Sequence, residues 1–124
     1  MPARILIADD DVDLTMTLAD RLQAAGFETI VAHEGVRVLE AVHRQKPQLI
    51  ILDWKMPAGE GSSILESLAK KEETRRIPII LLSGMEDPSV SEKALKLGVK
   101  AFIKKPYETA ELMKVIQEAL NHGG

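Results

Sequence analysis

Aspartates, a serine and a lysine carry the chemistry that this sequence offers, and each of them follows an apolar run. Asp9–Asp11 follow "RILIA", Asp53 ends "LIILD", Ser83 ends "IPIILLS" and Lys105 follows "KAFIK". Carboxylate oxygens suit a hard cation such as Mg²⁺, and a lysine ammonium suits a carboxylate or phosphate oxygen. If these groups meet in space, they form a site at which an aspartate can receive a phosphoryl group.

Each of these residues also has an ordinary structural explanation. An aspartate run is commonly a turn or a helix cap, and we expect Asp11 or Asp13 to cap the helix that follows. A single aspartate after a strand, such as Asp53, or a serine in a turn, such as Ser83, is common in loops. The chemical hypothesis therefore requires all of these groups to reach the same edge of one fold.

Short apolar runs alternate with amphipathic segments along the chain. The predicted strands are residues 4–9, 28–32, 49–53, 77–83 and 100–104. Three of them, 4–9, 49–53 and 77–83, are apolar without polar alternation, which is typical of strands buried on both faces of a parallel sheet. The other two are short, with five residues each, which favours positions toward the edges of that sheet.

Five helices are predicted between and after these strands. They span residues 13–25, 36–45, 63–71, Pro88 to Gly98, and 108–121. Gly26 is a good stop for the first helix, and Ser63 with Glu66 has the spacing of a capping box. Pro88, directly after Asp87, suits the first position of the fourth helix.

Repeated strand–helix units predict a parallel sheet with right-handed crossovers and helices on both faces. Ligands bind at the carboxyl ends of the strands in such sheets. Asp9, Asp10 and Asp53 should therefore converge in an acidic pocket, with Ser83 and Lys105 at the same edge. Clustered carboxylates repel each other, and a divalent cation would relieve that repulsion.

The three histidines show no metal-binding spacing. His33, with Glu34, follows the second strand and is expected to lie off to one side. We expect His33, His43 and His122 all to be surface residues. A phosphoryl donor would be a histidine of another protein.

Composition narrows the class of protein. The chain has 124 residues, 45% of them hydrophobic and 28% charged, a net charge of −3 and no cysteine. Disulfides and thiolate metal sites are therefore excluded, and the charge argues against a nucleic-acid partner. No apolar run approaches the ~20 residues that cross a bilayer, and the N-terminus has no signal-peptide pattern. One cytoplasmic domain, without membrane insertion, is the expectation.

Four motifs in order, "ILIADDD", "LIILDWKMPAGEG", "IILLSG" and "FIKKP", give the chain a family resemblance. It resembles the receiver domain of bacterial two-component response regulators over essentially its whole length. The resemblance implies one receiver domain over residues 1–124. It also implies a flavodoxin-like (βα)5 fold, with a doubly wound parallel sheet in the strand order 2-1-3-4-5.

The resemblance implies a role for each acidic residue. Asp53 matches the phosphoacceptor, and Asp9 and Asp10 match the acidic pair that holds Mg²⁺ or Mn²⁺. The backbone carbonyl of Lys55 matches a third metal ligand. A neutral or acidic residue is frequent at position 55, so we expect the lysine side chain to alter the kinetics of dephosphorylation.

The resemblance also implies a switch. Ser83 matches the hydroxyl residue that turns toward the phosphoryl group, Phe102 the aromatic residue that moves with it, and Lys105 the family's lysine. The Lys105–Pro106 bond is commonly cis in such domains. The implied partners are a sensor histidine kinase or a histidine phosphotransfer protein, and the protein would catalyse its own phosphorylation and hydrolysis without being a conventional enzyme.

The output face would comprise the helix 88–98, the strand 100–104 and the helix 108–121. Its lysines include Lys93, Lys96, Lys100 and Lys104. They form either a solvated basic face or a docking surface for an acidic protein that remains to be identified. The protein itself would be a monomer or a weak, phosphorylation-dependent dimer.

Two other functions compete with this one. A phosphorylation-independent protein-binding module could keep the pocket only as scaffold. A flavodoxin-like enzyme binding FMN or a nucleotide would require Gly, Ser or Thr after the first strand, but the acidic loop there would repel a phosphate. The last alternative is the least favoured.

Overall fold

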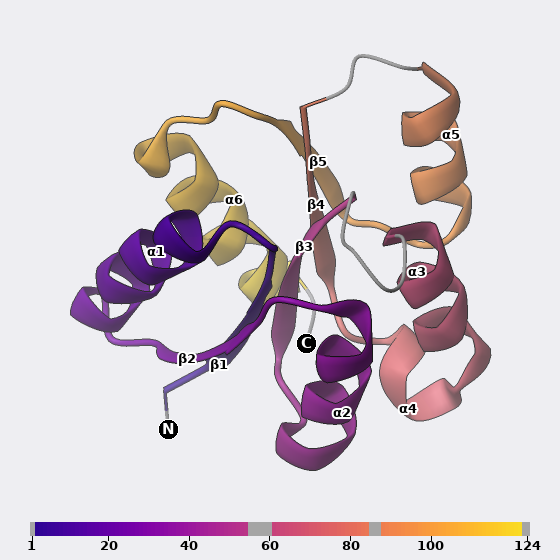
Figure 1. Ribbon diagram of the computed structural model, residues 1–124, viewed down its shortest axis with the longest axis horizontal. Helices are drawn as coiled ribbons and strands as arrows, with labels where there is room; N and C mark the ends of the chain where they lie inside the picture. The colour runs from indigo at the N-terminus through magenta and orange to yellow at the C-terminus, as the bar shows by residue number, and fades with distance from the viewer. Residues whose placement is uncertain (1, 55–60, 85–87, 123–124) are drawn as a thin grey trace.

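A computed structural model describes residues 2–54, 61–84 and 88–122 of this protein (Figure 1). Its five strands form one parallel sheet in the order β2-β1-β3-β4-β5. The strands are β1 (Arg4–Ala8), β2 (Glu28–Ala32), β3 (Leu49–Asp53), β4 (Ile79–Ser83) and β5 (Ala101–Lys104). The predicted flavodoxin-like order is confirmed, and the two short runs do form the edge strands.

Helices cover both faces of the sheet, as Figure 1 shows. They are α1 (Val12–Ala24), α2 (Gly35–Gln45), α3 (Gly61–Lys70), α4 (Glu72–Arg75), α5 (Pro88–Lys96) and α6 (Thr109–His122). Helices α1 and α6 pack on one face, while α2, α3 and α5 pack on the other. None of the helices in the described part of the chain is long and apolar enough to span a bilayer.

The sheet divides the core into two layers because side chains alternate along each strand. Ile5 and Ile7 of β1 join the layer under α1 and α6. Leu6 and Ala8 of the same strand join the layer under α2, α3 and α5. All four side chains are fully buried, which explains why this strand reads as a continuous apolar run.

Local signals set several helix ends. The Asp11 side chain caps α1 by accepting a hydrogen bond of 3.0 Å from the backbone N–H of Leu14, as expected. Gly26, just past this helix, has a φ of +96°, a conformation that disfavours other residues. Pro88 is the first residue of α5, also as expected. The capping-box prediction was wrong, because α3 begins at Gly61 and Ser63 lies inside it.

Helix α4 was not predicted from the sequence. It is a single turn, and the Thr74 side chain at its centre is buried. The Thr74 hydroxyl donates a hydrogen bond of 2.6 Å to the carbonyl oxygen of Leu68 in α3. This bond satisfies a carbonyl oxygen near the C-terminal end of α3 and links α4 to α3 at the point where the chain turns.

The strand register brings the acidic residues together. Ala8 on β1 pairs with Leu52 on β3. The next residues along these two strands are Asp9 and Asp53, which therefore lie level at the carboxyl edge of the sheet. Asp9 follows the buried pair Ile7 and Ala8, and Asp53 follows the buried pair Ile51 and Leu52. Because side chains alternate along a strand, the two carboxylates point to the same face of the sheet.

Candidate functional site

Three carboxylates form an acidic cluster at the carboxyl ends of β1 and β3. Asp9, Asp10 and Asp53 each contribute an oxygen, and these oxygens all lie within 4.8 Å of one another. Asp9 is fully buried and Asp53 is 6% exposed, whereas Asp10 is open to solvent. Two of the charges are thus largely removed from water, which is costly unless a cation compensates them.

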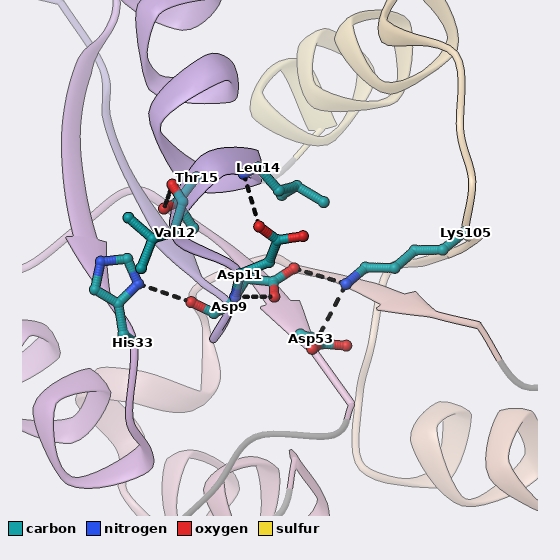
Figure 2. A network of polar contacts seen from close by, with 8 residues as sticks. All are labelled: Asp9, Asp11, Val12, Leu14, Thr15, His33, Asp53 and Lys105. Carbon is teal, nitrogen blue, oxygen red and sulfur yellow. Dashed lines mark hydrogen bonds and ion pairs between the residues drawn. The ribbon is translucent and has the colours of Figure 1, made fainter.

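Lys105 supplies the compensating cation from the loop after β5 (Figure 2). Its ammonium nitrogen lies 2.8 Å from Oδ2 of Asp9 and 3.6 Å from Oδ2 of Asp53. Burial acts to lower the pKa of Lys105, but the hydrogen bond to Asp9 and the charges of Asp53 and Asp9 outweigh it. The net result is a pKa above the ordinary value for lysine.

The Asp9 carboxylate is held at both oxygens. Oδ1 accepts a hydrogen bond of 3.0 Å from the backbone N–H of Asp11, and Oδ2 accepts the bond from Lys105. The Asp9 N–H donates to the carbonyl of Ala32 on β2 at 3.1 Å. This residue therefore has a fixed orientation before any ligand arrives, while Asp10 faces solvent beside it.

Ser83 ends β4, the strand next to β3, and is 2% exposed. Its carbonyl oxygen accepts a hydrogen bond of 2.7 Å from the Lys105 N–H, so the ends of β4 and β5 are joined directly. Phe102 lies in β5, opposite Leu81 on β4, and is partly buried against the layer under α5. Both residues thus lie on the strands that approach the acidic cluster.

Two further expectations concern the loops. The Lys105–Pro106 peptide bond is cis, as the resemblance implies. The predicted ligand carbonyl of Lys55 lies outside the described residues. On either side of this position, the Gly61 N–H donates a hydrogen bond of 2.7 Å to the Trp54 carbonyl.

Sequence reasoning missed two residues at this site. His33 follows the edge strand β2, and its Nδ1 lies 3.0 Å from the backbone oxygen of Asp9, a contact that was not predicted (Figure 2). Tyr107 follows Lys105 by two residues and is half-buried. Burial raises the pKa of the Tyr107 hydroxyl, the charge of Asp9 raises it further, and Lys105 offsets part of this.

The donor set fits a hard divalent cation. Carboxylate oxygens alone make up the cluster, and Mg²⁺ or Mn²⁺ prefers such ligands over nitrogen or sulfur. Lys105 brings one positive charge against three carboxylates. A divalent ion bound by Asp9, Asp10 and Asp53 would bring the remaining charge close to balance.

Comparison with known proteins identifies the family. Residues 5–117 match the family model described as the response regulator receiver domain. The chain belongs to this family, whose members receive signals in two-component systems and interact with histidine kinases or phosphotransfer proteins.

Among curated proteins, the chain is similar to the transcriptional regulatory protein PdtaR of Mycobacterium tuberculosis. The two are 32% identical over 122 residues, which cover 98% of this chain and 58% of that protein. The phosphate regulon transcriptional regulatory protein PhoB of Rhizobium meliloti is 31% identical over 97% of this chain and 53% of its own length. The chain thus spans somewhat more than half the length of these relatives.

Solved structures of isolated receiver domains match almost end to end. A CheY-like response regulator receiver domain protein from Methanospirillum hungatei has a TM-score of 0.93 and 28% identity. The match covers 99% of this chain and 97% of that one. A response regulator from Chloroflexus aurantiacus has a TM-score of 0.91 and 26% identity, over 98% and 100% of the two chains.

Proposed function

We propose that the Asp53 carboxylate accepts a phosphoryl group from a phosphohistidine on a sensor histidine kinase or a histidine phosphotransfer protein. An Asp53 oxygen attacks the phosphorus, a P–O bond forms, and the P–N bond to the donor histidine breaks. The released imidazole nitrogen then takes up a proton. The observation that carries this proposal is the meeting of three carboxylates and the Lys105 ammonium at one strand edge.

Asp9, Asp10 and Asp53 are the side chains that would hold Mg²⁺ or Mn²⁺. The bound cation would neutralise charge on the phosphoryl oxygens. Lys105 would donate to one phosphoryl oxygen and the Ser83 hydroxyl to another, with Phe102 moving as the hydroxyl does. These groups stabilise charge as it redistributes during transfer, so the domain itself catalyses its phosphorylation and later hydrolysis.

The phosphoryl group adds about −1.5 to −2 charges where Lys105 and Ser83 converge. Since the Lys105 N–H already bonds to the Ser83 carbonyl, a movement of one strand end is transmitted to the other. The output face proposed is therefore α5, β5 and α6. Exposed lysines lie on it at positions 93, 96, 100 and 104, and the apolar Leu95 beside them is 65% exposed.

An acidic protein is the partner that such a face fits best. Lys93 has one weak contact, 4.0 Å from an oxygen of Glu66, so its charge remains available to a partner. Sensor kinases transfer their phosphoryl groups in the cytoplasm, and the proposal places the domain there. A single domain over residues 1–124, acting as a monomer or weak dimer, is the simplest form of this proposal.

Mass spectrometry after incubation with acetyl phosphate and Mg²⁺ tests the proposal. The wild-type protein should gain one phosphoryl group, and Asp53→Asn should gain none. Asp20→Asn, which changes an exposed aspartate of α1, is the matched control and should be labelled like the wild type. Labelling that survives in Asp53→Asn would place the acceptor elsewhere. No labelling in the wild type would favour the phosphorylation-independent binding module instead.

Magnesium binding can be tested without phosphoryl transfer. A cation that binds only the folded state raises the melting temperature in proportion to the logarithm of its concentration. Millimolar Mg²⁺ should therefore raise the melting temperature of the wild type and have a smaller effect on Asp10→Asn. An unchanged wild-type melting curve would count against the acidic cluster as a metal site.

A further inference from the structure

His33, like Tyr107, is a residue at the site to which the proposed chemistry gives no role. It follows β2, is half-buried, and points its ring at the turn after β1 (Figure 2). Its Nδ1 lies 3.0 Å from the backbone oxygen of Asp9, a residue 24 positions away in the chain. A carbonyl oxygen can only accept a hydrogen bond, so Nδ1 must carry the proton.

This contact continues the β1–β2 ladder beyond its last backbone pair. The final regular bond is donated by the Asp9 N–H to the Ala32 carbonyl at 3.1 Å. Past Ala32 the chain turns into α2, with Glu34 as the N-cap residue. The His33 side chain therefore supplies a donor to the Asp9 carbonyl just where β2 has ended. Since Asp9 is fully buried, this carbonyl needs such a partner.

With this hydrogen bond, the backbone N–H, the backbone carbonyl and both carboxylate oxygens of Asp9 each have a partner. Ala32 accepts from its N–H, His33 donates to its carbonyl, and Asp11 and Lys105 donate to its two carboxylate oxygens. The carbonyl of Asp9 belongs to the same peptide unit as the N–H of Asp10. The orientation of that peptide therefore determines where the exposed carboxylate of Asp10 points.

We propose that His33 is a positioning residue, which orients the Asp9–Asp10 peptide through its Nδ1–H and thereby sets the affinity of the acidic cluster for Mg²⁺. The inference rests on the proposed function, because it concerns the same metal site. Groups that hydrogen-bond to a metal ligand, without contacting the metal themselves, typically change the affinity for the metal 10- to 100-fold. His33 acts on the backbone of a ligand, so we expect an effect of about tenfold, at the lower end of this range.

The test compares three variants by isothermal titration with Mg²⁺. His33→Ala removes the donor and should raise the dissociation constant by about tenfold. In His33→Asn the amide nitrogen lies the same number of bonds from Cα as Nδ1, so it can donate to the Asp9 carbonyl and restore most of the affinity. His43→Ala changes an exposed histidine of α2 and should bind like the wild type.

Several outcomes would overturn the inference. If His33→Ala binds Mg²⁺ as tightly as the wild type, His33 does not position the cluster, although the metal site itself stands. If Ala and Asn variants weaken equally, the Nδ1–H is not the group that matters. If the wild type binds no Mg²⁺, the proposed metal site fails, and the role of His33 fails with it.

A spectroscopic measurement keeps the inference testable even if His33→Ala does not fold. In a ¹H–¹⁵N spectrum of the wild-type imidazole groups, neutral His33 should carry its proton on Nδ1. An exposed histidine such as His43 is the internal reference, since neutral imidazole in water prefers the other nitrogen. A His33 ring protonated only at Nε2 would contradict the proposed hydrogen bond.

Discussion

The Lys105 ammonium lies closer to Asp9 than to Asp53, at 2.8 Å from the one and 3.6 Å from the other. The lysine is therefore held mainly by Asp9, a proposed metal ligand, and lies farther from Asp53, the proposed phosphoacceptor. Under the proposed function, a cation bound at Asp9 would compensate its charge and would leave the ammonium available to a phosphoryl oxygen on Asp53. Metal and lysine thus share one carboxylate, and their effects on stability should be coupled.

Replacing Lys105 tests this coupling. Lys105→Gln removes the ammonium that contacts two buried carboxylates, and it should lower the free energy of unfolding by about 1–2 kcal/mol. This is less than the ~3–5 kcal/mol for breaking a fully buried pair, because the lysine side chain is 23% exposed. Millimolar Mg²⁺ should recover most of the loss in urea unfolding experiments. Lys114→Gln, at an exposed position of α6, should show neither effect.

The contribution of Lys105 should also depend on pH. The pKa of Lys105 is raised in the folded protein, although burial opposes the effect of Asp9 and Asp53. A raised pKa gives stability that is complete below the unfolded value of about 10.4 and is lost as pH rises through the folded value. The difference in unfolding free energy between wild type and Lys105→Gln should therefore shrink above pH ~10.4. A constant difference across this range would contradict the charge-based explanation.

Tyr107 offers an optical measure of the same charges because it is the only tyrosine. Burial and the charge of Asp9 raise the pKa of its hydroxyl, with Lys105 acting in the opposite direction. Its tyrosinate absorbance should therefore appear above the ordinary pKa of about 10. Asp9→Asn should lower the midpoint part of the way, because the contribution of burial remains. A wild-type midpoint at or below the value of the unfolded protein would refute this assignment.

Gly61 should tolerate no side chain. A Cβ atom at this position would lie 2.5 Å from the Trp54 carbonyl oxygen and 2.8 Å from the Trp54 Cα, both of them backbone atoms. Gly61→Ala should therefore destabilise the fold by about 1–3 kcal/mol, as overpacking typically does. The emission of Trp54, the only tryptophan, should change as well. In Gly84→Ala the new methyl group meets nothing within 4 Å, and this variant is the control.

Much of this architecture follows from local sequence patterns. Continuous apolar strands, the Asp11 cap and Pro88 identify the elements, because their effects act within a few residues. The resemblance supplied the strand order, which places Asp9 beside Asp53. Helix α4 escaped prediction because one turn has no periodicity, and it depends on the burial of Thr74.

The residues of the candidate site likewise divide into those that the sequence predicted and those that it did not. Asp9, Asp10, Asp53 and Lys105 were expected together because strand ends in a parallel sheet share one edge. His33 was not, since its contact depends on the pairing of β1 with β2. That pairing sets Ala8 level with Ala32, so Asp9 and His33 follow at the same height. The strand order 2-1-3-4-5, applied to the residue after each strand, predicts that Asp9 and His33 are neighbours.

The partition of the core by the sheet bears on how such a domain changes its partners. Among the described residues, the buried side chains on the α1 and α6 side form a separate cluster from those on the α2, α3 and α5 side. Substitutions more than about 7–10 Å apart usually have additive effects on stability. We therefore expect that either flank can acquire a new binding specificity while the opposite flank keeps its own, with the proposed phosphorylation edge common to both.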